Sequence, residues 1–175
     1  MSRSLPAQEN KVGTYMENPA LSFLIKNRLV KGQPEGETTR IWNEILHRVF
    51  AAEDGYTTGP EMQFGAGRAD LFTAHVILDV RAFEKKFLIV ECKLPGKEGQ
   101  GSIWELGANQ LAGYLASITS ARYRRYGAIA VGKAVRFYEW VDEELVDFQS
   151  DGTVYYIDRQ CQTVTARLAY FRDNH

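Results

Sequence analysis

The sequence predicts a mixed α/β or α+β domain in which a central β-sheet is flanked by helices. Three features lead to this fold class: an apolar helical stripe in residues 38–50, two strand-like apolar runs around residues 81–85, and a second pair of strand-like runs between residues 128 and 140. The chain has 175 residues, of which 45% are hydrophobic, so it is long enough to bury one core. A single domain is therefore expected.

The first elements are predicted from composition and from residues that end helices. Residues 1–19 carry Pro, Asn, Glu and Gln with little periodicity, which is typical of a flexible or loosely packed leader. A single domain is expected over residues 20–175, with its core at about residues 37–140. Residues 20–30 are predicted to form a short helix, which the Pro- and Gly-containing run at residues 31–36 ends.

The next helix carries the clearest helical pattern. Thr38 or Thr39 can cap its start, and Asp54-Gly55 is expected to stop it. Apolar residues recur on one side at Ile41, Ile45 and Val49, with Trp42, Leu46 and Phe50 beside them. The pattern predicts an amphipathic helix that is buried along this stripe.

A strand hairpin is predicted to follow. Residues 71–80 and 87–92 have strand character, and residues 81–85 can close an antiparallel turn between them. Residues 87–92 are almost wholly apolar, as in a strand buried on both faces. Glu91 and Lys93 are two positions apart, so their side chains share one face of this strand. The hairpin would bring Asp70, which begins the first strand, beside Glu91.

These three charged residues suggest metal chemistry. Two carboxylates held together repel each other unless a cation lies between them, and carboxylates with water suit Mg²⁺, for which Mn²⁺ is the natural substitute. Lys93 could then position or help deprotonate an attacking water and offset charge on a phosphoryl group. The three residues alone more often indicate a surface salt bridge among Asp70, Glu91 and Lys93, and the surrounding residues decide between the two interpretations.

The helix after the hairpin contributes two further candidates. Ser102-Ile103-Trp104-Glu105 has the pattern of a capping box, and a glycine-rich loop before it is suited to close over a substrate. Gln110 and Tyr114 lie four residues apart, on one face of this helix. Geometry alone also allows a core role, with the Tyr114 hydroxyl satisfied and Gln110 bonded to it or to the backbone.

In this order, Asp70, Glu91-Cys92-Lys93 and Gln110-x-x-x-Tyr114 resemble the PD-(D/E)XK nuclease superfamily, in its RecB-like and phage exonuclease-like branch. The resemblance covers roughly residues 37–140, and Ala69 replaces the family proline. It implies a restriction-endonuclease-like mixed sheet flanked by helices, in the element order αβββαββ. It also implies that Asp70, Glu91 and the Cys92 carbonyl bind metal, and that Lys93 supports the nucleophilic water while Gln110 and Tyr114 arrange the site.

In several branches of the superfamily that the chain resembles, a glutamate of the first helix completes the metal site. Glu44 is the candidate for this role, and Glu37 is the second choice. The spacing of Glu44 and Arg48 is explained as well by an i,i+4 ion pair on the solvent side.

Basic residues follow the Gln110 helix. The net charge of −1 argues against a strongly basic coat protein for nucleic acid, but it leaves room for a local basic surface. Tyr123 and Tyr126 lie among these residues and would stack on bases. The expected nucleic-acid contacts are Arg68, Arg122, Arg124, Arg125, Lys133 and Arg136. An ordinary helix end is the alternative, because Arg and Lys also favour the C-terminal dipole.

The remaining elements are read from shorter signals. Residues 128–131 and 134–140 are predicted strands, joined by a tight turn at Gly132-Lys133. Residues 153–157 are predicted to form a further strand, and residues 164–172 a last helix or strand.

The sequence thus predicts a Mg²⁺-dependent nuclease whose partner is nucleic acid, with DNA favoured over RNA. Two alternatives stay open: a catalytically inactive nuclease-fold module that binds nucleic acid or protein, and a nuclease effector or toxin domain. Cys92 and Cys161 are too few for a disulfide framework, and no apolar run suits a membrane span or a secretory signal. An intracellular location, in cytoplasm or nucleus, is expected without membrane attachment. The sequence leaves open whether the chain forms a homo-oligomer.

Overall fold

The computed structural model describes residues 4–119, 122–148 and 152–175. Its helices are α1 (Pro19–Arg28), α2 (Gly36–Val49), α3 (Gly101–Ala116) and α4 (Cys161–Asp173), with short 3-10 helices η1 (Tyr15–Glu17) and η2 (Ala52–Asp54). The strands are β1 (Tyr56–Phe64), β2 (Gly67–Ile77), β3 (Phe83–Lys93), β4 (Arg125–Val131), β5 (Ala134–Val141), β6 (Glu144–Asp147) and β7 (Tyr155–Tyr156). The predicted mixed α/β class is confirmed.

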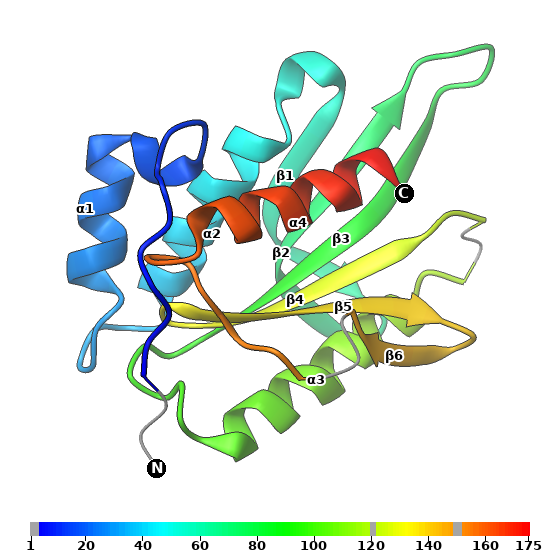
Figure 1. The fold of residues 1–175 in the computed structure, drawn as a ribbon. Helices are drawn as coiled ribbons and strands as arrows, with labels where there is room; N and C mark the ends of the chain where they lie inside the picture. Colours follow the sequence, from blue (N-terminus) through cyan, green and yellow to red (C-terminus); the bar gives the residue numbers. More distant parts are fainter. Residues whose placement is uncertain (1–3, 120–121, 149–151) are drawn as a thin grey trace.

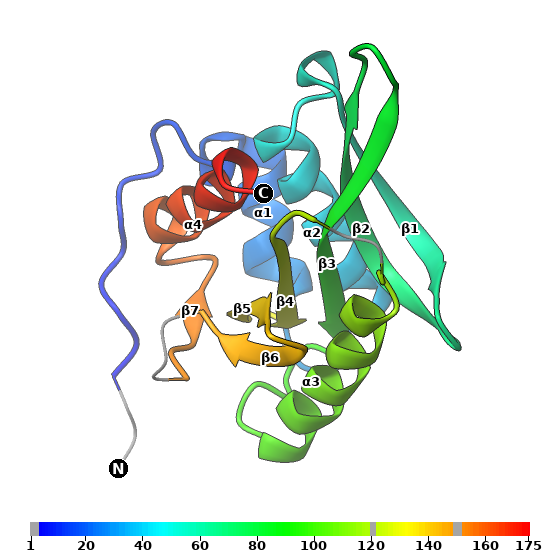
Figure 2. The same ribbon diagram turned by 90° about the vertical axis from the view of Figure 1, so that its right-hand side faces the viewer.

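The described strands form one open sheet that is mostly antiparallel. Its order is β1-β2-β3-β4-β5-β6, and β7 pairs with β5. Only β3 and β4 run parallel, and α3 connects them across one face. Helices α1, α2 and α4 cover the opposite face (Figures 1 and 2). Both faces of the central strands are therefore buried, which explains the continuous apolar run in β3.

Helix α2 has the predicted apolar stripe, and Ile41, Ile45 and Leu46 are fully buried. Its start differs from the prediction, because Glu35 occupies the N-cap position and makes no side-chain cap bond. Thr38 lies inside the helix, and its hydroxyl donates a 2.9 Å hydrogen bond to the Lys93 carbonyl. Because this bond already satisfies the buried Thr38 hydroxyl, the hydroxyl does not cap α2. Thr38 thus fixes α2 against the end of β3.

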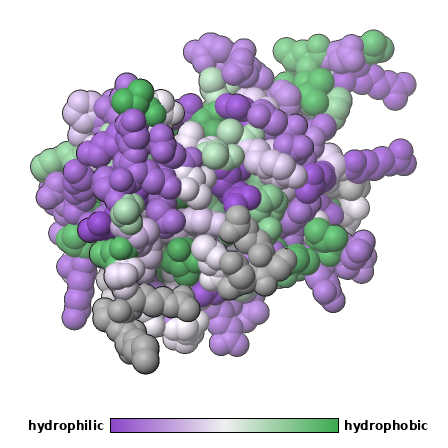
Figure 3. All heavy atoms as spheres, in the orientation of Figure 1, coloured by the Kyte–Doolittle hydropathy of each residue, from purple (hydrophilic) through white to green (hydrophobic). Residues whose placement is uncertain are grey.

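The predicted hairpin is confirmed, with Leu71 opposite Val90 in an antiparallel register. Its turn lies at residues 78–82, earlier than the predicted 81–85. Leu78 and Val80, which we had placed in the first strand, are 82% and 95% exposed. Hydrophobic atoms accordingly reach solvent at the upper right of Figure 3, where Figure 1 shows the tip of this hairpin. The turn-favouring Asp79 outweighs the apolar character of its neighbours.

Strand β1 was not predicted from the sequence. It contains Gly59 and Pro60, which are poor strand residues, and Glu61 follows with a positive φ of 49°. β1 is an edge strand that pairs only with β2, and its burial does not alternate regularly. An edge position tolerates these residues because one side of the strand needs no partner.

The segment before α1 corrects the expectation of a loosely packed leader. Tyr15 and Met16 are buried, and the Tyr15 hydroxyl donates to the Ile157 carbonyl at 2.8 Å. Glu9 accepts hydrogen bonds from the backbone N–H and the hydroxyl of Thr163, at the start of α4. The described part of this segment therefore packs against the C-terminal helix and satisfies one of the free N–H groups in its first turn.

The later elements follow the prediction in outline. The strands around Gly132 are confirmed as β4 and β5, and Gly132 has the positive φ of 54° that a tight turn requires. The C-terminal segment is the helix α4, and the predicted strand at residues 153–157 is only the two-residue β7. The capping box is wrong, because Gln100 is the N-cap of α3 and Ser102 lies inside the helix. None of the described helices combines the length and apolar character that crossing a membrane requires.

Candidate active site

Strands β2 and β3 separate at the position of Asp70. Their backbone pairing ends at Leu71 and Val90. Beyond this pair, the Asp70 Oδ2 accepts a 2.8 Å hydrogen bond from the Cys92 N–H. The side chain of Asp70 takes the place of a backbone acceptor and so stays beside β3. The predicted neighbourhood of Asp70 and Glu91 is confirmed by this contact.

Lys93 is held between the sheet and α3. Its Nζ donates to Glu91 Oε1 at 2.7 Å and to Gln110 Oε1 at 2.6 Å. Glu91 and Lys93 are 3% and 8% exposed, which is rare for charged residues. The structure therefore brings together four of the predicted residues, Asp70, Glu91, Lys93 and Gln110, and excludes a solvent-exposed salt bridge.

One carboxylate oxygen of this group is left without a partner. Glu91 Oε2 is buried and forms no hydrogen bond of ordinary geometry with a described residue, although the backbone N–H and the carboxyl group of Asp70 interact with the Glu91 carboxylate. Burial raises the pKa of Glu91 to about 7, because the Lys93 hydrogen bond offsets only part of the desolvation and the Asp70 charge raises it further. Burial also raises the pKa of Asp70, although the Cys92 N–H and Lys93 oppose this. The negative charge of both acids is thus only partly compensated.

The donors at this point suit a divalent cation. The N–H and C=O of one strand residue point to the same side of the strand, so the Cys92 carbonyl faces β2 as its N–H does. The orphaned Glu91 oxygen, the Asp70 carboxylate and this carbonyl are hard oxygen donors that Mg²⁺ accepts together with water. Among the described residues, no group of three or more His, Cys, Asp or Glu side chains is positioned to hold a metal ion. A bound ion would have to draw on the carbonyl and water.

Tyr114 contributes through packing. A Cβ atom at Gly67 would lie 2.7 Å from the Tyr114 ring, so only glycine leaves room for the ring at the start of β2. Burial raises the pKa of the Tyr114 hydroxyl, and the charges of Glu91 and Asp70 raise it further. Tyr114 of α3 therefore belongs to the wall of the site, where it packs against Gly67, three residues before Asp70 on β2. The Gly-x-x-Asp spacing in the sequence has this physical origin.

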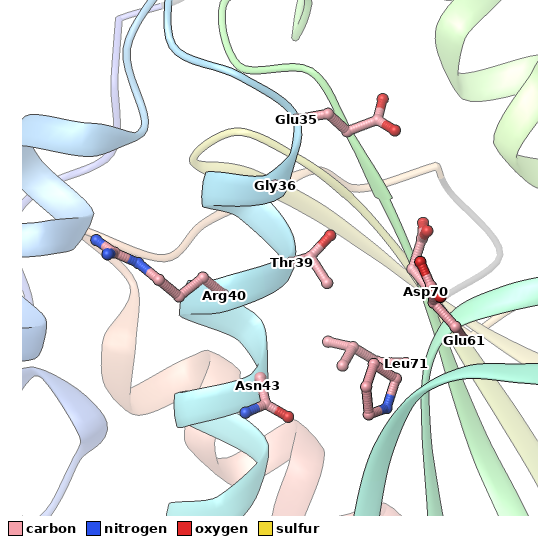
Figure 4. A pocket seen from close by; sticks show the side chains of 9 residues that line it. Glu35, Gly36, Thr39, Arg40, Asn43, Glu61, Asp70 and Leu71 are labelled. Atoms are coloured by element: carbon pink, nitrogen blue, oxygen red, sulfur yellow. The ribbon is translucent and has the colours of Figure 1, made fainter.

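A cavity of about 590 Å³ opens between α2 and the β1–β2 pair, next to Asp70. Figure 4 shows side chains from α2 and both strands around it. Its lining includes Glu35, Thr39, Asn43, Pro60, Glu61 and Asp70. Sequence reasoning missed Glu35 and Glu61. The contact of Glu61 with this cavity could have been found only by recognising β1 as the neighbour of β2.

The first-helix glutamates do not reach this cavity. α2 lines it with Thr39 and Asn43, which are about one turn apart, whereas Glu44 is exposed and outside the lining. Glu37 pairs with Arg40 at 3.0 Å. The helical face that meets the sheet is set by the buried stripe, and neither Glu44 nor Glu37 occupies the part of α2 that faces Asp70.

The basic residues after α3 do not form one surface near the site. Four have contacts within the protein: Arg124 with Glu139 (2.7 Å), Arg125 with the carbonyls of Leu115 and Ile118 at the end of α3, Lys133 with Asp158 (3.6 Å), and Arg136 over the Trp104 ring (4.9 Å). Ile129 is the β4 partner of Glu91, so Arg125 lies about 13 Å along the strand from that position. Arg68 and Arg122 are exposed, and only Arg68 is close to Asp70 in sequence.

Comparison of the chain with protein-family models, with curated proteins and with solved structures found no significant match. The resemblance to the PD-(D/E)XK superfamily therefore stays a prediction from the motifs. The functional argument rests on the geometry of the site itself.

Proposed function

We propose that this protein is a metal-dependent nuclease that hydrolyses phosphodiester bonds of nucleic acid, with DNA as the preferred substrate. The observation that carries the proposal is the environment of Glu91. One of its buried carboxylate oxygens, close to Asp70, has no hydrogen bond of ordinary geometry, and the next charged residue of the strand is the buried Lys93. A structural ion pair would be expected to satisfy both oxygens of a buried carboxylate. A site that receives a cation leaves one of them free.

In this proposal the residues of the site have two roles, metal binding and activation of the attacking water. Asp70, Glu91 and the Cys92 carbonyl would hold Mg²⁺, which when bound would polarise the scissile phosphate and stabilise the leaving oxygen. Lys93 has three N–H donors, and the described residues use two of them. The third is left for the attacking water or a phosphoryl oxygen. Gln110 keeps Lys93 in this position from the facing helix.

The order of elements also supports the proposal. From α2 to β5 the chain runs through a helix, three strands, a helix and two strands. This is the order that the resemblance to the PD-(D/E)XK superfamily implies. Asp70 lies near the start of the second of these strands and Glu91 near the end of the third, as that resemblance requires.

The test is a cleavage assay with four substrates: supercoiled plasmid, linear duplex DNA, single-stranded DNA and RNA, each with Mg²⁺, Mn²⁺ or EDTA. We expect cleavage of DNA with either metal and none with EDTA. Lys93→Ala should abolish cleavage, while Lys85→Ala, a matched lysine variant about 26 Å away along the same strand, should cleave like the wild type. Asp70→Asn serves as the second inactive variant, because its amide oxygen can still accept the Cys92 N–H and preserve the fold.

Three results would refute the proposal: no cleavage of any substrate, cleavage that persists in EDTA, or variants that cleave like the wild type. Binding of nucleic acid without cleavage would favour the inactive module instead.

A further inference from the structure

Three acidic residues occupy one row across three neighbouring strands. In the β1–β2 register, Pro60 is opposite Leu71 and Met62 is opposite Ala69, so Glu61 lies opposite Asp70. In the β2–β3 register, the last pair, Leu71 and Val90, places Asp70 beside Glu91 in the same way. The row therefore runs from Glu61 through Asp70 to Glu91.

This arrangement is costly for the protein without a cation. Like charges directly opposite each other on paired strands are destabilising. Glu61 also adopts a φ of 49°, a left-handed conformation that a residue with a side chain rarely adopts. Among the described ion pairs, none involves Glu61, and the one arginine of this cavity, Arg40, pairs with Glu37. Figure 4 shows the side chains of Glu61 and Asp70 next to each other at the cavity.

An independent observation indicates what the row would bind. Glu91 Oε2, in a residue that is 3% exposed, forms no hydrogen bond of ordinary geometry among the described residues, and the polar group that acts on it from β2 is Asp70. A buried carboxylate oxygen next to the Asp70 carboxylate, with Glu61 on the other side of Asp70, needs a positive partner. Lys93 supplies one positive charge, and it already contacts the other oxygen of Glu91. The net charge of the row and Lys93 is thus negative.

We infer that Glu61 is a third carboxylate ligand of the divalent cation that Asp70 and Glu91 hold. This inference rests on the proposed function, and it adds to it a ligand from the edge strand β1. Glu61 is exposed in the present arrangement, so its side chain would turn toward Asp70 when the ion binds. The glutamate that completes the site would then come from β1, and Glu44 of α2 would have no part in it.

Titration of the protein with Mn²⁺, followed by calorimetry, tests the assignment without any substrate. The proteins are wild type, Asp70→Asn, Glu61→Gln and Glu44→Gln, and the last two make the same change at the two competing glutamates. We expect Asp70→Asn to lose binding and Glu61→Gln to weaken it by about tenfold or more, the lower range for losing a residue that supports a metal site. Glu44→Gln should bind like the wild type.

Thermal unfolding gives a second reading that separates a ligand from a structural residue. Without metal, Glu61→Gln should melt at a higher temperature than the wild type, because one of two facing charges is removed. With saturating Mn²⁺ the variant should gain less stability than the wild type gains. A purely structural Glu61 would instead leave the gain from Mn²⁺ unchanged.

The outcomes distinguish the two levels of the argument. If the wild type binds no Mn²⁺, the proposed function fails and the inference fails with it. If Asp70→Asn loses binding while Glu61→Gln keeps wild-type affinity, the inference is overturned and the proposed function stands. Weaker Mn²⁺ binding by Glu44→Gln together with normal binding by Glu61→Gln would identify Glu44 of α2 as the third carboxylate ligand.

Discussion

Two groups of charged residues look alike in the sequence and differ in the structure. The first, the acid–lysine cluster, consists of Asp70, Glu91 and Lys93, and it is largely buried with one carboxylate oxygen lacking a partner. The second, the basic segment, consists of Arg122, Arg124, Arg125, Lys133 and Arg136. Polar contacts within the protein account for Arg124, Arg125 and Lys133, whereas Arg136 lies over the Trp104 ring and its buried Nε has no hydrogen-bond partner among the described residues. A dense run of charge is thus a poor guide to function. A buried charge that the fold does not fully compensate is a better one.

Cleavage activity should show the largest contrast between the two groups. Asp70→Asn should lower the rate of DNA cleavage by about 10²-fold to 10⁴-fold, the range expected when groups that act on the transition state are removed. Arg124→Gln, in the basic segment, should change it less than about threefold, because its contacts with Glu139 and Tyr170 are structural. Single-turnover rates with Mg²⁺ measure both. Equal losses in the two variants would remove the distinction.

Loss of the hydrogen bond between α2 and the end of β3 should give the next largest effect, a fall in stability. Thr38→Val removes the buried hydrogen bond to the Lys93 carbonyl and leaves that carbonyl unpaired. The free energy of unfolding should fall by about 1–3 kcal/mol. Urea denaturation measures this change, with Thr57→Val on exposed β1 as a control that should stay within about 0.5 kcal/mol of wild type. A Thr38→Val protein as stable as the control would show that this bond does not fix α2.

The pH dependence should separate the groups in a further way. Burial raises the pKa of Glu91 from 4.5 to about 7, so the folded metal-free protein holds this proton more tightly than the unfolded chain does. The stabilisation is therefore complete below pH 4.5 and is lost as the pH rises through 7. Glu91→Gln should flatten this decline in urea denaturation curves. Because metal needs the deprotonated carboxylate, Mn²⁺ affinity should rise over the same interval.

An unchanged slope in the Glu91→Gln protein would show that another group controls this interval. An Mn²⁺ affinity that stays constant from pH 6 to pH 8 would argue against Glu91 as a ligand.

The smallest effects are expected in the basic segment. Arg125→Met loses two hydrogen bonds to carbonyls at the end of α3 and should cost about 1 kcal/mol of stability. Arg124→Gln breaks a largely exposed ion pair and should cost less than about 1 kcal/mol. Neither change should alter the affinity for DNA. A clear loss of DNA binding in Arg125→Met, with the fold intact, would restore the segment as a nucleic-acid contact.

The sequence predicted the parts of the site that depend on local periodicity. The i, i+2 spacing of Glu91 and Lys93 and the i, i+4 spacing of Gln110 and Tyr114 each fix which side chains share a face. The hairpin was also predictable, because apolar runs on both sides of a polar turn favour antiparallel pairing. These predictions sufficed to place Lys93 beside Glu91, whereas the position of Gln110 at the site was implied only by the resemblance to the PD-(D/E)XK superfamily.

The remaining features depend on packing between distant segments. Thr38 or Thr39 was predicted to cap the helix, and only the contact of Thr38 with the Lys93 carbonyl across the interface explains its place inside α2. β1 was missed because Gly59, Pro60 and Glu61 disfavour a strand locally, and its pairing with β2 outweighs this preference. Glu44 is exposed and lies outside the cavity beside Asp70, because the rotation of α2 on the sheet decides which of its residues face Asp70. Arg125 binds the end of α3, a contact made only when the chain turns back into β4.

The central claim is that the acid–lysine cluster is a metal site, and anomalous diffraction from crystals soaked in Mn²⁺ tests it most directly. We predict a Mn²⁺ peak between the Asp70 and Glu91 carboxylates, within reach of the Cys92 carbonyl, which disappears in Asp70→Asn crystals treated identically. No peak at this position under saturating Mn²⁺, with Glu91 still bonded only to Lys93, would contradict the account.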